Sequence, residues 1–221
     1  RKSLIVNNEI YHVFNRSVAQ QPIFISKYDY KRALNLIDFY RFEDTNIRFS
    51  FYNRMKYQQK SDFMYSLYST QKLVEIYSFC LMPNHFHFLL KQLTEGGITK
   101  FLRIFQNSYA KYINTKTERN GAAFQAMFKT IRIESDNQLL HVFRYISLNP
   151  VTSYLLKNVE ELKQYPWSSF CDYFTKNQPH QFVETKLICE HFLNKAKLEK
   201  FVKDQVNYQR TLKQIAHLTF E

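Results

Sequence analysis

The order of apolar and polar positions predicts a small antiparallel sheet with helices packed against it. Residues 10–16 alternate as a strand does, so successive side chains should point to opposite faces. The two faces would carry Tyr11, Val13 and Asn15 on one side and His12, Phe14 and Arg16 on the other. An apolar strand at 73–81 should turn at 82–84 into a third strand, and a fourth is expected at 124–133.

Three further stretches place apolar residues at the three- and four-residue spacing of a helix. These helices are expected at residues 28–42, 99–119 and 136–149, with Ser26, Thr99 and Ser135 or Asp136 as their caps. The core-facing stripes would be Leu34, Ile37 and Tyr40 in the first helix and Ile98, Leu102, Phe105, Tyr109 and Tyr112 in the second. Pro150 disfavours helical geometry at Asn149, so the third helix should end or kink there.

The order strand, helix, strand, strand, helix, strand is that of a ferredoxin-like α+β fold. The polar stretch 43–70 interrupts this order, and we interpret it as an insertion that is partly helical or loop-like. Residues 1–156 would form the main domain, and residues 157–221 a helical extension packed on it. Helical stretches are expected in that extension near 184–192 and 198–218.

Composition and charge narrow the class of partner. Lys and Arg number 31 against 19 Asp and Glu, and the net charge of +12 makes a polyanion the expected partner. Phe, Tyr and Trp make up 17% of the chain and offer faces on which unpaired bases can stack. Basic and aromatic residues together favour nucleic acid over a membrane.

The cysteines and the chain ends bear on the compartment. Cys80, Cys171 and Cys189 are scattered and odd in number, which fits a reducing cytoplasm better than a disulfide framework or a zinc cluster. We find no signal peptide and no apolar run of membrane length, and we therefore expect a cytoplasmic protein. The chain begins at Arg1 rather than Met, so a few preceding residues are expected to be missing.

The third strand carries the strongest candidate chemistry. His85 and His87 are two residues apart, so a strand would place both rings on one face, roughly 6 to 7 Å apart along the backbone. That spacing suits a single metal ion, because neutral imidazole is the commonest protein metal ligand. A bare His-x-His pair is nevertheless more often a pair of partly buried histidines than a metal site.

The residues around this pair resemble a known signature. Met82-Pro83-Asn84-His85-Phe86-His87, followed by an apolar strand, resembles the single-tyrosine HUH transposases, in particular the REP-associated tyrosine transposases. The first strand is similar to that family's Tyr-His-Val-x-Asn-Arg opening, and 145–151 is similar to its Tyr-Ile-x-x-Asn-Pro-Val segment. The stretch 165–170 is again similar to a family segment. The resemblance covers about residues 9–42 and 73–175.

This resemblance implies an active site and a reaction. His85 and His87 would hold a divalent Mg²⁺ or Mn²⁺ ion, Tyr145 on an added catalytic helix would be the nucleophile, and Asn149 would complete the metal shell. Positions i and i+4 share a helix face, which is consistent with Tyr145 and Asn149 meeting one ion. Single-stranded DNA with hairpin ends is the implied substrate, and a covalent 5′-phosphotyrosine the implied intermediate. Candidate DNA contacts are Asn15, Arg16, Lys111, Lys129 and Arg132.

Several alternatives stay open from the sequence. Tyr109 and Tyr112 are rival nucleophiles, although core packing is the better interpretation of both. His12 is interpreted as structural, and His141 is left outside the site. A nucleic-acid-binding module without active nuclease is the main alternative function, and a metal hydrolase that activates water is a weaker one. Monomer and homodimer are both compatible with the pattern.

Overall fold

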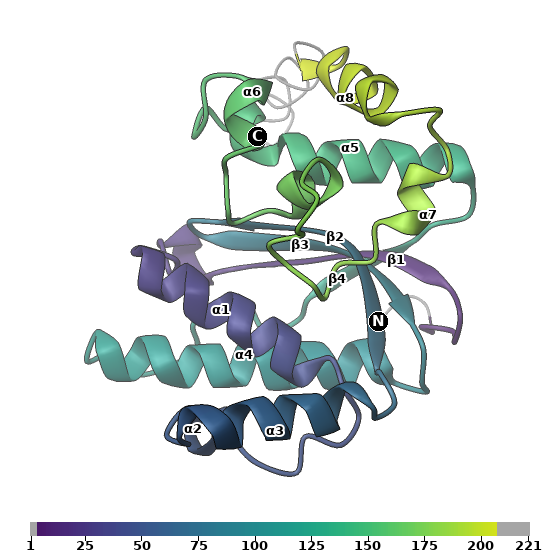
Figure 1. The fold of residues 1–221 in the computed structure, drawn as a ribbon. Helices are drawn as coiled ribbons and strands as arrows, with labels where there is room; N and C mark the ends of the chain where they lie inside the picture. The colour runs from purple at the N-terminus through teal and green to yellow at the C-terminus, as the bar shows by residue number, and fades with distance from the viewer. Residues whose placement is uncertain (1–3, 207–221) are drawn as a thin grey trace.

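The computed structural model describes residues 4–206 and contains a four-stranded antiparallel sheet. Its strands lie in the order β2-β3-β1-β4 (Figure 1). They span β1 (Ile10–Arg16), β2 (Val74–Met82), β3 (His85–Gln92) and β4 (Lys129–Arg132). Neighbouring strands are antiparallel throughout. This arrangement confirms the predicted ferredoxin-like α+β fold.

Helices cover both faces of the sheet. Helices α1 (Lys27–Tyr40) and α4 (Gly97–Lys116) lie on one face, and α5 (Asp136–Thr152) lies on the other (Figure 1). Side chains alternate along each strand, so the sheet contributes to two separate apolar clusters. Tyr11, Val13 and the β3 phenylalanines belong to the α1 and α4 cluster, whereas Leu89 packs with α5.

The helix boundaries mostly follow the predicted ones, and the caps explain the differences. Ser26 and Asp29 form the capping box at the start of α1, where the Asp29 carboxylate accepts from the backbone and hydroxyl of Ser26. The predicted Thr99 cap is wrong, because α4 begins two residues earlier behind Gly96, whose φ of 66° is left-handed. A side chain at Gly97 would collide with the backbone oxygen of Leu73.

The expected break before Pro150 is also absent. Helix α5 begins at the predicted Ser135 cap and continues through Pro150 to Thr152. Proline cannot donate a backbone hydrogen bond to Ile146. The last turn is nevertheless buried, with Asn149, Pro150 and Val151 among its buried residues. Packing therefore outweighs the local preference of the residue before proline.

The fourth strand is shorter than the predicted 124–133. Only Lys129–Arg132 pairs with β1, opposite its first half. Phe124 forms an isolated bridge with Ser17 and turns its ring into the apolar cluster, against Phe86. Between Phe124 and Lys129 the chain departs from the ladder, although the Gln125 N–H still donates to the backbone oxygen of Arg16 at 2.8 Å.

The insertion is partly helical, as predicted. It contains α2 (Phe49–Tyr52) and α3 (Tyr57–Tyr68). Both pack against Phe39 of α1 through aromatic rings, with Phe49 and Phe63 at centroid distances of 5.3 and 5.8 Å. The insertion therefore lies on the α1 and α4 side of the sheet (Figure 1).

The segment after α5 covers the β2 edge of the sheet. This segment contains α6 (Val159–Leu162), which packs on α5, and η2 (Ser169–Tyr173). The short turn η1 (Val18–Gln20) follows β1 instead. Leu81 donates its backbone N–H to Trp167 at 2.8 Å, and the Tyr173 hydroxyl donates to Tyr77 at 2.6 Å. These bonds satisfy an edge that would otherwise be open to pairing.

The end of the described chain packs on α5. Two short helices, α7 (Lys186–Cys189) and α8 (Lys195–Lys203), are found where longer helical stretches were expected at 184–192 and 198–218. Residues 207–218 of the second expected stretch lie outside the described residues. Leu198 and Val202 of α8 share the apolar cluster of α5. The division of the chain near residue 156 stays a prediction. Across residues 4–206, no helix is both long and apolar enough to cross a membrane.

Candidate active site between two strands and a helix

The two histidines of β3 lie on the same face of the sheet. Their ring centroids are 5.1 Å apart and their planes are nearly perpendicular. Phe86, between them, points to the opposite face and packs against Phe105 of α4. The strand alternation therefore directs both imidazoles toward α5.

Each histidine is held through its Nδ1 atom. His85 Nδ1 lies 2.6 Å from the side-chain oxygen of Asn84, and His87 Nδ1 lies 3.0 Å from Nε2 of His12. An amide oxygen can only accept, so His85 donates from Nδ1, and the neutral form of the ring then has its lone pair on Nε2. This is the tautomer that can bind a metal through Nε2.

His12 lies inside this site, although its sequence position indicated a structural residue. It comes from β1, is 6% exposed, and its ring also packs against Phe14. Burial lowers its pKa to about 4, so the ring is neutral near pH 7. The sequence showed only that His12 shares a face with Phe14. The register between β1 and β3 pairs Phe14 with His87 and so places His12 diagonally beside His87.

The Tyr145 side chain of α5 contacts both His12 and His87. Its ring centroid lies 5.4 Å from that of His87 and 5.8 Å from that of His12, with its edge toward both. Burial raises the pKa of the Tyr145 hydroxyl, while a hydrogen bond to the Asn149 side chain and the charge of Arg16 act in the opposite direction. A phenol, two imidazoles and a nearby guanidinium thus converge from three elements.

Asn149 follows Tyr145 by one helical turn. Its side chain is 1% exposed, and its Nδ2 lies 3.4 Å from the backbone oxygen of Tyr145. Because α5 stays helical through Pro150, the two side chains remain on one helix face.

The rival tyrosines are on the opposite side of the sheet. Tyr109 is fully buried in the α4 cluster and donates its hydroxyl to Ile23 at 2.7 Å. Tyr112 donates its hydroxyl to Asp29 at 2.8 Å. Burial raises the pKa of both hydroxyls, for Tyr112 to about 12. Neither ring approaches the histidine face.

The five candidate DNA contacts are in different environments. Asn15 is 3% exposed, and its amide nitrogen donates to Gln106 and Gln125, so it offers no free donor at the surface. The other four are exposed: Arg16, Lys111, Lys129 and Arg132. Arg16 and Lys129 lie opposite His85 and Phe14 in the ladder, which places them on the histidine face.

The remaining two face elsewhere. Arg132 pairs with Tyr11 in the ladder and forms an ion pair with Glu9 at 2.8 Å. Lys111 lies on α4, on the face below the sheet in Figure 1. The sequence-predicted set is therefore divided between two sides of the molecule.

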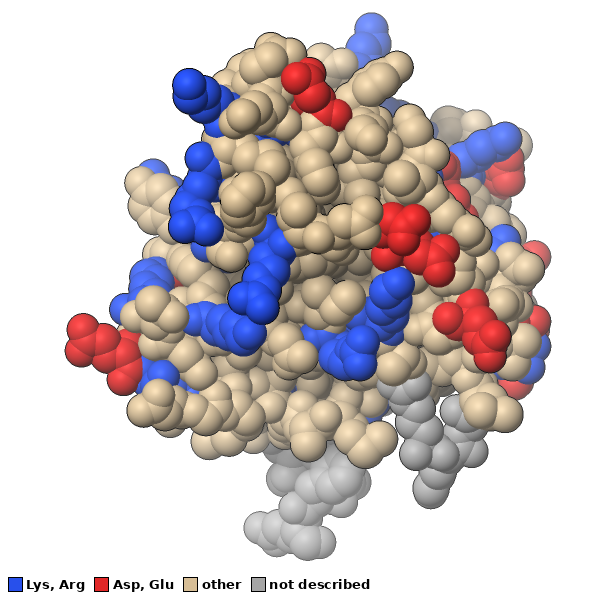
Figure 2. Space-filling view, turned by 90° about the horizontal axis from the view of Figure 1, so that it is seen from below, with Lys and Arg blue, Asp and Glu red and all other residues tan. Residues whose placement is uncertain are grey.

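A basic hollow lies on this lower face. It has a volume of about 600 Å³, and its lining includes Arg32, Arg48, Lys111 and Lys116. The Arg32 guanidinium is stacked over the rings of Phe49 and Tyr112, at 4.9 and 4.8 Å. Figure 2 shows Lys and Arg side chains spread over this face. Composition had indicated a basic protein, but not that so many cations gather away from the histidines.

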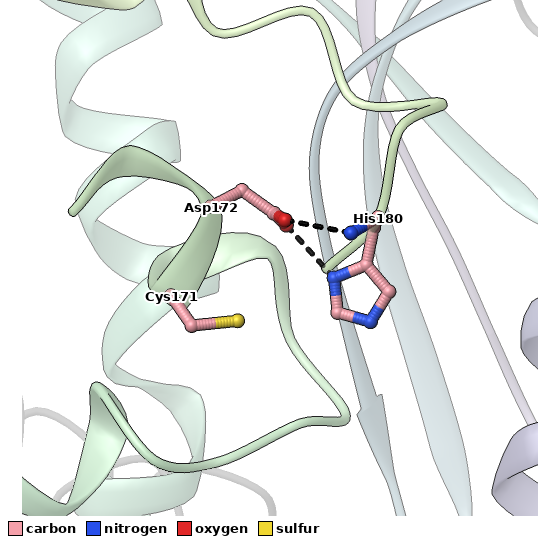
Figure 3. Close-up of side chains that lie close together, drawn as sticks. All are labelled: Cys171, Asp172 and His180. Carbon is pink, nitrogen blue, oxygen red and sulfur yellow. Dashed lines mark hydrogen bonds and ion pairs between the residues drawn. The ribbon is translucent and has the colours of Figure 1, made fainter. Parts of the chain in front are cut away.

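A second group of metal-type side chains lies in the C-terminal segment. Cys171, Asp172 and His180 are buried, and their ligand atoms lie within 4.8 Å of one another (Figure 3). Both nitrogens of His180 are already bonded, Nδ1 to Asp172 at 2.8 Å and Nε2 to the backbone oxygen of Pro166 at 3.1 Å. Burial raises the pKa of Cys171 to about 12, which disfavours the thiolate that a metal needs. This group therefore joins η2 to the loop that carries His180 and is a poor metal site.

Two comparisons with known proteins agree with the geometry. Residues 45–149, which include both histidines, Tyr145 and Asn149, match a family model described as "Transposase IS200 like". No curated protein matches the chain. A solved REP-associated tyrosine transposase bound to a REP hairpin is similar, with a TM-score of 0.52 and 15% identity over 84% of this chain and 91% of that one. The predicted resemblance to tyrosine transposases is confirmed.

Proposed function

We propose that this protein is a metal-assisted transposase-type nuclease and strand transferase that cleaves single-stranded, hairpin-bearing DNA through a covalent phosphotyrosine. One observation carries the proposal: the Tyr145 ring meets the His87 ring at 5.4 Å, from an element far away in the sequence. A tyrosine, two histidines and an asparagine are the residues that the tyrosine transposase resemblance requires. They are the residues that gather at this face of the sheet.

The side chains fit a divalent ion. His85 and His87 offer imidazole nitrogens, their Nδ1 atoms are engaged by Asn84 and His12, and Asn149 offers an amide oxygen. Such a mixed nitrogen and oxygen set suits Mg²⁺ or Mn²⁺. When bound, the ion would supply Lewis-acid polarisation of the scissile phosphate. The protein's part is to fix the rings and to exclude the wrong tautomers.

Tyr145 is the nucleophile in this proposal. Its hydroxyl gives up its proton as the oxygen forms a bond to phosphorus, the bond from phosphorus to the 3′ oxygen breaks, and the 3′ oxygen takes up a proton. The products are a 5′-phosphotyrosine and a free 3′-hydroxyl. Because the phosphodiester energy is kept in the new bond, a 3′-hydroxyl can reverse the step and join a new end. Arg16 favours the ionised phenol through its charge.

The charge distribution supports a nucleic-acid substrate. Arg16 and Lys129 lie on the histidine face, and the basic hollow lies on the other. Neutralising phosphates at both faces would suit a substrate with a folded stem and an unpaired end. The cytoplasmic location and the choice between monomer and homodimer stay predictions.

The direct test is covalent capture. The protein is incubated with labelled single strands that carry a hairpin, with Mn²⁺, and then resolved under denaturing conditions. We expect a denaturant-resistant adduct that Tyr145→Phe abolishes, because the substitution removes one oxygen and little volume. Tyr112→Phe, on the opposite side of the sheet, is the matched control and should keep the adduct.

The outcomes separate the alternative functions. Hairpin binding without any cleavage would favour a binding module. Cleaved DNA without an adduct, in the wild type, would favour water as the nucleophile. An adduct mapped to Tyr109 or Tyr112 would contradict the assignment of α5 as the catalytic helix.

A further inference from the structure

We propose that His12 is a positioning residue that accepts the Nδ1 proton of His87 and thereby fixes the His87 tautomer with its lone pair on Nε2. The inference rests on the proposed function only in that it takes His87 to be a metal ligand. The hydrogen bond itself is a property of the protein alone.

The geometry of the pair is that of a specific hydrogen bond. His12 Nε2 and His87 Nδ1 are 3.0 Å apart, and the two ring planes differ by 24°. Such nearly parallel rings, joined edge to edge, place the N–H of one along the in-plane lone pair of the other. Both residues are almost fully buried, at 6% and 5% exposure. Water therefore competes poorly for either nitrogen.

Two proton arrangements can satisfy this bond, and they have opposite consequences. In one, His12 donates from Nε2, so the neutral His87 ring keeps its proton on Nε2 and has no lone pair there. In the other, His87 donates from Nδ1 and its Nε2 lone pair is available as a ligand. Because Nδ1 of His87 is occupied by His12, only the second arrangement allows His87 to bind a metal.

The neighbouring histidine supports the second arrangement. His85 donates from Nδ1 to the Asn84 oxygen, whose only role can be acceptor. His12 would accept the Nδ1 proton of His87, just as Asn84 accepts that of His85. Both histidines could then bind the metal through Nε2. Metal-binding histidines commonly donate their other N–H to a carbonyl or carboxylate in this way, and losing that partner typically lowers metal affinity by about 10 to 100-fold.

The experiment compares two substitutions at position 12. His12→Gln keeps a side-chain oxygen that can accept near the place of Nε2, whereas His12→Phe keeps a ring against Phe14 and Tyr145 but has no acceptor. Phe14→Leu is the matched control, because the Phe14 ring touches His87 at 5.4 Å without a hydrogen bond. Thermal unfolding of each variant checks that the fold survives.

The first readout uses metal-free protein. Long-range ¹H–¹⁵N NMR of ¹⁵N-histidine-labelled protein reports which ring nitrogen carries the proton, and the His87 signals are assigned by their loss in His87→Gln. We expect the Nδ1–H tautomer in the wild type, in His12→Gln and in Phe14→Leu. In His12→Phe we expect a shift toward Nε2–H. An Nε2–H tautomer in the wild type would overturn the proposal.

The second readout is Mn²⁺ affinity, measured by electron paramagnetic resonance. His12→Phe should weaken binding by about 10 to 100-fold, and His12→Gln should stay within a few-fold of the wild type. Equal losses in both variants would contradict the acceptor role. If the wild type bound no Mn²⁺, the metal part of the proposed function would fail, and the tautomer measurement would still decide whether His12 accepts from His87.

Discussion

At the scale of single residues, the candidate site depends on side chains that hydrogen-bond the two histidines and hold their rings in place. Asn84 and His12 hold the two imidazoles through their Nδ1 atoms. Asn149 touches Tyr145 and is itself almost completely buried. Burial matters because a buried polar side chain keeps its bonds against competition from water. The side chains of the candidate site are thus held in place by contacts within the protein alone.

Asn149→Ala should weaken the metal site without removing the nucleophile. We expect Mn²⁺ affinity to fall by about tenfold and cleavage to slow at limiting metal, since an oxygen ligand would be lost from a site still held by two imidazoles. At saturating Mn²⁺ the Tyr145 adduct should still form, which denaturing gels would show.

Asn137→Ala is the control for this change, because Asn137 is an exposed residue of the same helix. It should leave metal affinity and adduct yield unchanged. Complete loss of the adduct in Asn149→Ala at every Mn²⁺ concentration would contradict a tuning role and indicate that Asn149 positions Tyr145.

A second residue-scale prediction concerns pH and Asp29. Burial alone would raise the pKa of this carboxyl, but the Lys116 ammonium and hydrogen bonds from Ser26 and Tyr112 outweigh it and lower the pKa to about 2. An unfolded Asp has a pKa of about 3.9, so the stabilisation is complete above roughly pH 4 and is lost as the pH falls toward 2. Its size is about 2 kcal/mol.

Urea unfolding between pH 6 and pH 2 would measure this loss. Asp29→Asn should be less stable at pH 6 and should show a flatter decline between pH 4 and pH 2 than the wild type. The exposed Asp62 is the matched control, and Asp62→Asn should change the stability at pH 6 by less than about 0.5 kcal/mol. An unchanged slope in Asp29→Asn would show that other carboxyls dominate the acid transition.

At the scale of elements, local sequence signals explain which helix and strand boundaries could be predicted. Helix α1 and strand β1 were predicted nearly to the residue, because a capping box and a clear alternation mark them locally. The ends of β4 and α5 were not. The chain departs from the ladder between Phe124 and Lys129, and the last turn of α5 is buried around Pro150. Both are tertiary effects that local preference does not contain.

The same reasoning applies to the candidate site. The two histidines could be placed on one face from spacing alone, and the family resemblance pointed to Tyr145 and Asn149. His12 was missed because its role follows from the register between β1 and β3, which pairs Phe14 with His87. Register between strands far apart in the sequence is set by long-range packing. A single sequence gives no direct signal of it.

Gly97→Ala tests the contact between α4 and the sheet. A new Cβ at this position would collide with the backbone oxygen of Leu73, so we expect a loss of about 1 to 3 kcal/mol even though alanine is the better helix former. Denaturant unfolding would measure it. Asn107→Ala, at an exposed position of the same helix, should change the stability by less than about 0.5 kcal/mol. Equal stability of Gly97→Ala and wild type would mean that the backbone at Leu73 shifts at no cost in free energy.

At the scale of the whole molecule, Lys and Arg side chains are exposed on both sides of the sheet. The histidine face carries Arg16 and Lys129, and the charge of Arg16 acts on the Tyr145 hydroxyl. The opposite face carries the basic hollow, lined in part by residues of α1 and α4. Lys and Arg side chains are spread over that face (Figure 2). A net charge of +12 would in itself attract any polyanion, so the distribution of the cations rather than their total would decide which surface meets a nucleic acid.

Salt dependence distinguishes specific phosphate contacts from a generally basic surface. Binding of hairpin-bearing single strands should weaken linearly in a plot of the logarithm of affinity against the logarithm of salt concentration, since each neutralised phosphate releases counterion. Removing one contacting cation should lower the slope by about 0.7 to 0.9. We expect that decrease for both Lys111→Gln, on the helical face, and Lys129→Gln, on the histidine face, if a stem and an unpaired end are held on opposite sides.

Lys186→Gln is the control, because Lys186 is 80% exposed on α7 and lies near Glu190. Its slope should match that of the wild type. A decrease confined to Lys129→Gln would restrict DNA to the histidine face and leave the basic hollow without a part in binding. A flat response in the wild type would mean that the positive charge serves solubility, because phosphate contacts that release counterion cannot be insensitive to salt.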